Sequence, residues 1–169
     1  MIDKSYPCNP GNYDSKKIRP YKSIKYIVIH YTGNKGDTAI NNCKYFANTI
    51  TKTSAHYFID RDGNIAKSVN MNRIAWSVGG LYNRVPLYGI ARNDNTVSIE
   101  LCDIVDKGIS PKQKKALKNL CKAIKKKCIN VKDIIRHYDV NGKSCPLYYV
   151  NNDDKWNKLK EEVKRYANI

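Results

Sequence analysis

Two short apolar runs, separated by a helical pattern, constrain the fold of this chain more than any other feature of its sequence. The run Lys25–His30 (KYIVIH) is rich in β-branched residues and is typical of a buried strand, and Thr96–Cys102 (TVSIELC) alternates as a second strand would. Between them, apolar residues recur at helical spacing from Ala39 to Ile50, after a capping residue at Asp37 or Thr38. Strands that alternate with helices predict an α/β fold.

The remaining patterns add a hairpin, two helices and one more strand. His56–Asp60 and Ile65–Val69 flank RDGN, a sequence typical of a hairpin turn. Ser110 has a glutamine three positions later, which predicts a capping box at the start of a helix. Ile134–His137 is predicted to be a short strand. A last helix should begin at Asp153 or Asp154 and bury Trp156, Leu159, Val163 and Tyr166.

The length of 169 residues indicates one domain. We expect a central mixed β-sheet flanked by helices over residues 23–169, after an N-terminal surface arm at residues 1–22. No apolar run is long enough to cross a bilayer, and the first residues lack the apolar core of a signal peptide. We therefore expect no membrane insertion, and synthesis in the cytoplasm without a signal peptide. The six cysteines fall mostly inside helix and strand patterns, so buried free thiols are predicted rather than a disulfide framework.

The charge of the chain is strongly positive, with 31 Lys and Arg residues against 15 Asp and Glu residues and a net charge of +16. This charge favours a polyanionic partner, either nucleic acid or an anionic cell wall, although a surface that only keeps the chain soluble would have the same composition. No zinc-finger, helix-turn-helix or RNA-binding pattern accompanies the charge, so we expect no nucleic-acid partner.

Three residues with metal-binding side chains lie at or beyond the ends of predicted strands. His30 and His137 each end a strand, and functional crevices in open α/β sheets lie beyond the carboxyl ends of strands. Cys145 follows across a loop long enough to fold back. Two imidazoles and a thiolate are ligands that zinc accepts, and three protein ligands leave a fourth position for water. Spacing alone leaves two other interpretations open: buried core side chains, or a Cys145–His137 nucleophile pair.

Two further residues would complete a hydrolytic site. Glu100 lies on the polar face of an otherwise apolar strand, and Lys143 precedes Cys145 by two positions. A carboxylate can carry a proton from water to a leaving amine, and a cation can stabilise a tetrahedral oxyanion. By composition alone, the same two residues could be a solvated edge carboxylate and an ordinary surface lysine.

Six segments, in this order, resemble the zinc-dependent N-acetylmuramoyl-L-alanine amidases. These are phage endolysins and bacterial autolysins that share a fold with the peptidoglycan recognition proteins. The segments are YIVIHYTG at 26–33, SAHYFIDRDGNI at 54–65, IAWSVGG at 74–80, NDNTVSIELC at 93–102, SPKQKKALKNL at 110–120 and RHYDVNGKSCP at 136–146. The resemblance covers residues 24–165.

The resemblance implies one Zn²⁺ per chain, held by His30, His137 and Cys145. It places Glu100 at the position of an acid/base glutamate and Lys143 at that of a catalytic lysine. The implied reaction is hydrolysis of the amide between the lactyl group of N-acetylmuramic acid and L-alanine in peptidoglycan. Anionic wall polymers such as teichoic acids are expected as further partners because of the charge, and the chain is expected to be a monomer that acts on the cell wall after release. The alternative is a non-catalytic peptidoglycan-binding module of the same fold.

The chain departs from the family pattern at two positions. Ala55 stands where some phage members have a catalytic tyrosine, which would shift proton transfer onto Glu100. Ser77 stands where many members have a groove histidine. We expect the substrate groove to include Ser77 together with His56, Trp76 and Asn95, with Asn95 and Ser98 also holding Glu100 in place.

Overall fold

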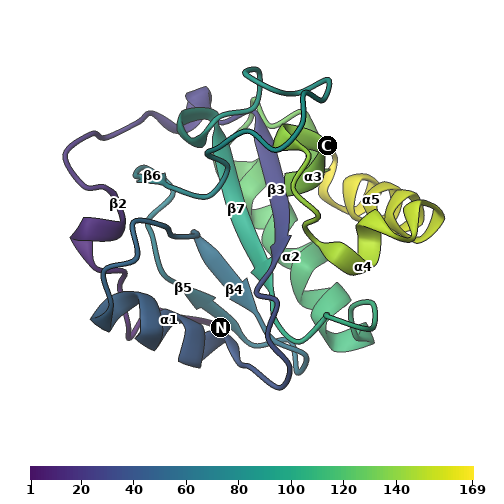
Figure 1. The fold of residues 1–169 in the computed structure, drawn as a ribbon, viewed down its shortest axis with the longest axis horizontal. Helices are drawn as coiled ribbons and strands as arrows, with labels where there is room; N and C mark the ends of the chain where they lie inside the picture. Colours follow the sequence, from purple (N-terminus) through teal and green to yellow (C-terminus); the bar gives the residue numbers. More distant parts are fainter.

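The computed structural model describes all residues from Met1 to Ile169. The chain forms eight strands and five α-helices in an α/β fold, which is the class that the sequence predicts (Figure 1). The strands are β1 (Ile2–Asp3), β2 (Tyr13–Asp14), β3 (Tyr26–Tyr31), β4 (Tyr57–Ile59), β5 (Ile65–Lys67), β6 (Ile74–Ala75), β7 (Thr96–Leu101) and β8 (Asp133–Arg136). The helices are α1 (Ala39–Asn48), α2 (Pro111–Lys127), α3 (His137–Asn141), α4 (Leu147–Val150) and α5 (Asp153–Ala167). None of these helices has the length and apolarity that crossing a membrane requires.

Six strands form a mixed sheet in the order β1-β5-β4-β7-β3-β8, and β2 pairs with β6 in a separate ribbon. Only the β4–β5 hairpin is antiparallel within the large sheet, as the RDGN turn predicts. At the centre, β3 pairs in parallel with β7 on one side and with β8 on the other. The carboxyl ends of these three strands therefore meet at one edge of the sheet.

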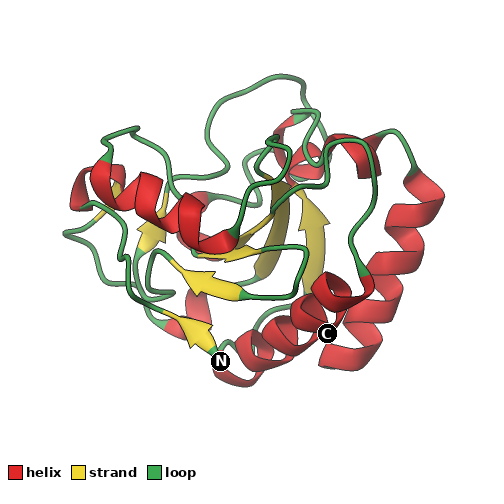
Figure 2. Ribbon diagram, turned by 90° about the horizontal axis from the view of Figure 1, so that it is seen from below, coloured by secondary structure: helices red, strands yellow, loops and turns green.

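Helices cover both faces of the sheet, so its central strands are buried on both sides (Figure 2). Helices α2 and α5 pack on one face, where Ile27 and Ile29 meet Leu117, Leu120 and other members of the main core. Helix α1 covers part of the opposite face, through a smaller cluster that contains Cys43 and Phe58. All six cysteines are buried and free, which confirms the prediction of buried thiols.

The helix caps follow local sequence signals. The Ser110 hydroxyl accepts a hydrogen bond from the Gln113 N–H at 3.0 Å, and the Gln113 side chain reaches back to the Ser110 N–H. Thr38, one of the two predicted caps, accepts from the Asn41 N–H at 3.2 Å. These contacts satisfy N–H groups that the first turn of a helix leaves without partners.

Three predicted elements differ from the structure. His137 begins helix α3 instead of ending a strand, because the Asp139 carboxylate caps the Arg136 N–H at 2.8 Å and starts a helical turn. Helix α4 follows Pro146, where no helix was expected before Asp153. Tyr166 is exposed, and the buried face of α5 ends with Ala167.

The first 22 residues are more closely integrated than a surface arm would be. Strand β1 adds to the edge of the large sheet beside β5, and β2 pairs with β6. Arg19 is buried, and its guanidinium donates to the carbonyl oxygens of Met71 and Asn93 at 2.8 and 2.9 Å. The domain boundary at residue 22 stays a prediction.

Candidate metal centre and groove

Five residues predicted to carry chemistry lie close together at the end of the sheet where β3, β7 and β8 finish. His30 on β3 lies directly opposite Glu100 on β7 in the parallel register, so both side chains face the same side of the sheet. His137 follows β8, the other neighbour of β3. The chain then returns through α3, so that Lys143 and Cys145 line the same cavity of about 700 Å³ as the two histidines and Glu100.

The two histidines and the cysteine form a compact donor cluster. Their candidate ligand atoms all lie within 4.8 Å of one another, and all three residues are buried. The rings of His30 and His137 lie 4.6 Å apart, and Cys145 Sγ lies 3.9 Å from His30 Nδ1. Nε2 of His30 and both ring nitrogens of His137 have no hydrogen-bond partner. Since buried polar atoms are ordinarily paired, these nitrogens fit a metal ion as their missing partner.

The surroundings hold both histidines in the neutral form that binds metals. Burial lowers the pKa of His30 well below its ordinary value, and the positive charges of His137 and Lys143 add to this effect. Burial, with a further contribution from Lys143, lowers the pKa of His137 to about 4. Burial and the nearby Glu100 raise the pKa of the Cys145 thiol to about 12. A thiol with this pKa is a poor nucleophile by itself, which argues against the Cys145–His137 pair as the catalytic unit.

Glu100 combines burial with a free acceptor atom. Its side chain is 19% exposed, Oε1 lies 4.0 Å from His30 Nδ1, and Oε2 has no hydrogen-bond partner. Burial raises the pKa of this carboxyl to about 7, although Lys143 acts in the opposite direction. A carboxyl with a pKa near neutrality can both take up and release a proton. Lys143 is exposed at the rim of the same cavity, as a cation for developing negative charge requires.

The predicted groove residues divide into two pairs. Trp76 and Ser77 line the cavity. His56 is fully buried behind it, where Nδ1 accepts the Ser98 N–H at 3.0 Å and Nε2 lies 2.9 Å from an Arg19 guanidinium nitrogen. Neither His56 nor Asn95 lines the cavity, so both predictions of groove contact need correction.

The prediction that Asn95 and Ser98 hold Glu100 in place is also wrong. Asn95 ends a 3₁₀ turn just before β7. Its side-chain oxygen accepts the Arg92 N–H at 2.8 Å, and its side-chain nitrogen donates to the Ile90 carbonyl at 2.9 Å. The Ser98 hydroxyl bonds the hydroxyl of Ser77. The Asn95 side chain therefore stabilises the loop before β7, the Ser98 side chain contacts the cavity wall at Ser77, and neither forms a hydrogen bond with Glu100.

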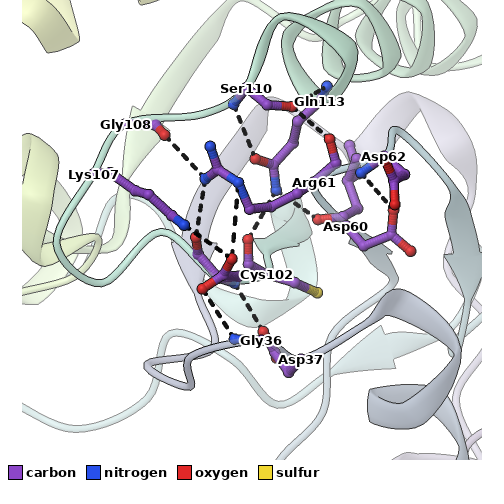
Figure 3. A network of polar contacts seen from close by, with 12 residues as sticks. Gly36, Asp37, Asp60, Arg61, Asp62, Cys102, Lys107, Gly108, Ser110 and Gln113 are labelled. Atoms are coloured by element: carbon purple, nitrogen blue, oxygen red, sulfur yellow. Dashed lines mark hydrogen bonds and ion pairs between the residues drawn. The ribbon is translucent and has the colours of Figure 1, made fainter.

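A network of polar contacts connects Asp37, one of the residues that line the cavity, to the neighbouring loops (Figure 3). Asp37, which we expected only as a possible helix cap, lines the cavity and accepts the Asp103 N–H at 2.8 Å and an Asn42 amide hydrogen at 2.6 Å. Asp103 in turn accepts the Gly36 N–H at 3.0 Å, and Arg61 donates to the Asp103 carbonyl at 3.0 Å. The loops after β3, β4 and β7 are thereby tied together. The one sequence signal for Asp37 was its place in the loop that follows His30.

Asn141, a fully buried residue, joins the loop that follows Ser77 and Val78 to the segment that carries Lys143. Its amide nitrogen donates to the carbonyls of Gly79 and Gly80 at 3.0 and 3.4 Å, and its Oδ1 accepts the Lys143 N–H at 3.1 Å. Its backbone carbonyl accepts the N–H groups of Tyr82 and the next residue at 3.1 and 2.9 Å. One residue therefore connects the start of loop 79–92 to the Lys143 segment, through both its side chain and its backbone carbonyl.

The fold and this donor set define the class of the chain: an α/β domain with a candidate metal centre on the floor of an open groove. Comparison with known families then identifies it more closely. The chain belongs to the N-acetylmuramoyl-L-alanine amidase family, whose model matches residues 20–147.

Individual relatives agree with this assignment. The chain is 30% identical over 166 residues to N-acetylmuramoyl-L-alanine amidase BlyA of Bacillus subtilis (strain 168), a match that covers 89% of this chain and 44% of BlyA. It is 28% identical to amidase CwlA of the same organism, over 91% of this chain and 54% of CwlA. The chain thus spans about half the length of these relatives.

Solved structures of similar fold include a mutant endolysin from Bacillus subtilis, with 25% identity, a TM-score of 0.73 and coverage of 96% of this chain and 98% of that one. PlyL has a TM-score of 0.75 at 22% identity and covers 96% of both chains. At that identity, PlyL supports the fold alone, and the fold it supports is the mixed sheet with flanking helices.

Proposed function

We propose that this chain hydrolyses the amide bond between the lactyl group of N-acetylmuramic acid and L-alanine in peptidoglycan, with Zn²⁺ as its cofactor. The observation that carries the proposal is the cluster of His30, His137 and Cys145 on the groove floor, where three buried ring nitrogens have no other partner. The choice of this amide bond as the one that is cleaved rests on membership of the N-acetylmuramoyl-L-alanine amidase family.

The three donors would hold one zinc ion through two neutral imidazoles and one thiolate. The chemistry that such an ion supplies is polarisation of the amide carbonyl and a lower pKa for water. Glu100 Oε2, which is buried and has no partner, would take a proton from the attacking water and give it to the leaving L-alanine nitrogen. The Lys143 ammonium group would stabilise the negative charge that develops on the carbonyl oxygen. Trp76 and Ser77, in the cavity wall, would contact the substrate on either side of the scissile bond.

The proposed function also concerns the location, the oligomeric state and the further partners of the chain. The substrate is in the cell wall, so the chain acts there after release from the cytoplasm in which it is made. We propose a monomer, because every residue assigned a role comes from one chain. The net charge of +16 favours anionic wall polymers such as teichoic acids as additional partners.

Metal analysis combined with an assay for new L-alanine amino termini in digested cell wall tests the function. One zinc per chain and release of amino termini are expected. Cys145→Ala should lose both, whereas Cys121→Ala, which removes a buried thiol in α2 far from the groove, should retain both. Glu100→Gln should retain zinc and lose cleavage.

Two results would contradict the proposal in different ways. Full cleavage by Cys145→Ala or by the metal-free protein would show that the cluster is not the reactive centre. Binding to walls with one zinc per chain, but without release of amino termini, would identify a non-catalytic peptidoglycan-binding module.

A further inference from the structure

The amino-terminal edge of the central strands carries a row of lysines that the proposed reaction does not use. Lys25 immediately precedes β3 and Lys132 immediately precedes β8. Lys67 ends β5 beside the first residue of β4, and burial together with the nearby charges of Lys4 and Lys127 lowers its pKa. Lys127 ends α2, Lys22 lies in the 3₁₀ turn before β3, and Lys4 follows β1. We call these six residues, Lys4, Lys22, Lys25, Lys67, Lys127 and Lys132, the basic edge.

Specific contacts hold the basic edge together. The Lys132 N–H donates to the Lys25 carbonyl at 2.9 Å, and the Asn130 amide donates to the Lys22 carbonyl at 2.8 Å. Lys127 Nζ lies 5.5 Å from the centre of the Tyr21 ring, next to Lys22. The row extends across a sheet six strands wide, or about 24 Å at the usual strand spacing.

The basic edge lacks compensating carboxylates. The fold joins two stretches of sequence, 15–36 and 107–132, that contain no Asp or Glu at all. None of the six lysines forms an ion pair, whereas five lysines farther along α2 and α5 do so: Lys112, Lys114, Lys118, Lys160 and Lys164. Asp133, the acid next to Lys132, is occupied by Lys160 and Lys164 at 2.9 and 2.8 Å. Asp3 beside Lys4 accepts the Ser5 N–H at 2.8 Å, and Asp94, two residues before β7, is paired with Arg92 at 3.2 Å.

We propose that the basic edge is a docking surface for a phosphodiester polymer of the cell wall, of the teichoic acid kind. A line of separate ammonium groups on flexible stems suits a long chain of evenly repeated phosphates, because each lysine is a point charge without a fixed geometry. Lys25 and Lys132 lie at the end of the strands away from the groove, since His30 is four residues along β3 from Tyr26, or about 13 Å at the usual rise per residue. A polymer bound there leaves the groove open. The choice of a wall polymer rests on the proposed function.

Two variants of equal charge test this surface. The edge variant carries Lys22→Gln, Lys25→Gln, Lys127→Gln and Lys132→Gln. The control variant carries Lys16→Gln, Lys17→Gln, Lys115→Gln and Lys158→Gln, at exposed lysines without carboxylate partners elsewhere on the surface. Both lower the net charge from +16 to +12. Binding is measured by co-sedimentation with Gram-positive walls and with the same walls stripped of phosphodiester polymers by hydrofluoric acid, alongside hydrolysis of a small soluble muramoyl peptide.

The edge variant should bind intact walls about tenfold more weakly than the control variant, and the difference should shrink as salt is added. On stripped walls the two should bind alike, and all three proteins should hydrolyse the soluble peptide at the same rate. Equal losses in both variants, undiminished binding of the wild type to stripped walls, or stronger competition by an oligonucleotide than by purified teichoic acid would each overturn the docking surface. Failure to hydrolyse the soluble peptide, with the binding difference intact, would instead overturn the proposed function alone.

Discussion

Replacement of Asn141 by alanine tests how one buried side chain supports the groove. The substitution removes a donor to the Gly79 carbonyl at 3.0 Å and an acceptor for the Lys143 N–H at 3.1 Å, and the longer contact to Gly80 is lost with them. Each of the two good hydrogen bonds contributes about 1 kcal/mol, and the cavity left by truncation of the fully buried Asn141 side chain adds to the cost. We expect a loss of about 2–3 kcal/mol in the free energy of unfolding.

Thermal unfolding of the metal-free protein gives the measurement. For a chain of this length the expected loss corresponds to a decrease in Tm of about 4–10 °C. Asn157→Ala, at an exposed position on α5, should change the free energy of unfolding by less than about 0.5 kcal/mol.

The conservative variant Asn141→Asp sharpens the test. It keeps an acceptor for the Lys143 N–H but places an oxygen against the Gly79 carbonyl, so it should be no more stable than the alanine variant. A decrease in Tm below about 1 °C for Asn141→Ala, or wild-type stability for Asn141→Asp, would refute the reasoning, because the hydrogen bonds would then contribute nothing.

Three further perturbations have defined outcomes. Gly63→Ala would place a Cβ 2.9 Å from the Lys112 carbonyl oxygen at a φ of +82°, so it should lower Tm more than Gly36→Ala, where φ is +70° and no atom lies within 4 Å. Partial burial raises the pKa of Asp133, but hydrogen bonds from two α5 lysines outweigh it and hold that pKa below its ordinary value. The two ion pairs of Asp133 therefore stabilise the fold above about pH 4, and this contribution is lost as pH falls through the lowered pKa. Asp133→Asn should reduce the free energy of unfolding by about 1 kcal/mol at pH 7, and acid-induced unfolding curves should show a smaller difference from the wild type at low pH. Removal of zinc by a chelator should lower Tm in the wild type, by the equivalent of about 4 kcal/mol if zinc is present at a thousand times its Kd, and should leave the Tm of Cys145→Ala unchanged.

The features that were predicted correctly from the sequence depend on interactions between residues that are close together in the chain. The Ser110 capping box and the RDGN hairpin are each decided within a few residues. The gathering of His30, Glu100 and Cys145 at one edge followed from the rule that parallel strands end together, combined with the family resemblance.

The errors arose where a distant contact decides the outcome. His56 is buried because a backbone N–H from β7 and the guanidinium of Arg19 meet its ring, and no local signal reports either. Asn95 is an exception, because its side chain contacts Ile90 and Arg92, only five and three residues away, instead of Glu100. Tyr166 fits the helical stripe of α5, but its hydroxyl reaches Asn119 on the exposed surface.

The loop 79–92 has two buried anchors, Asn141 near its start and Asn95 near its end, and a middle section that exposes Leu81, Tyr82, Tyr88 and Ile90. Because both ends of this loop are anchored, replacement of its middle section should leave the donor cluster in place. Exchange of residues 84–89 would therefore change the exposed surface of the loop without changing the residues that carry the chemistry.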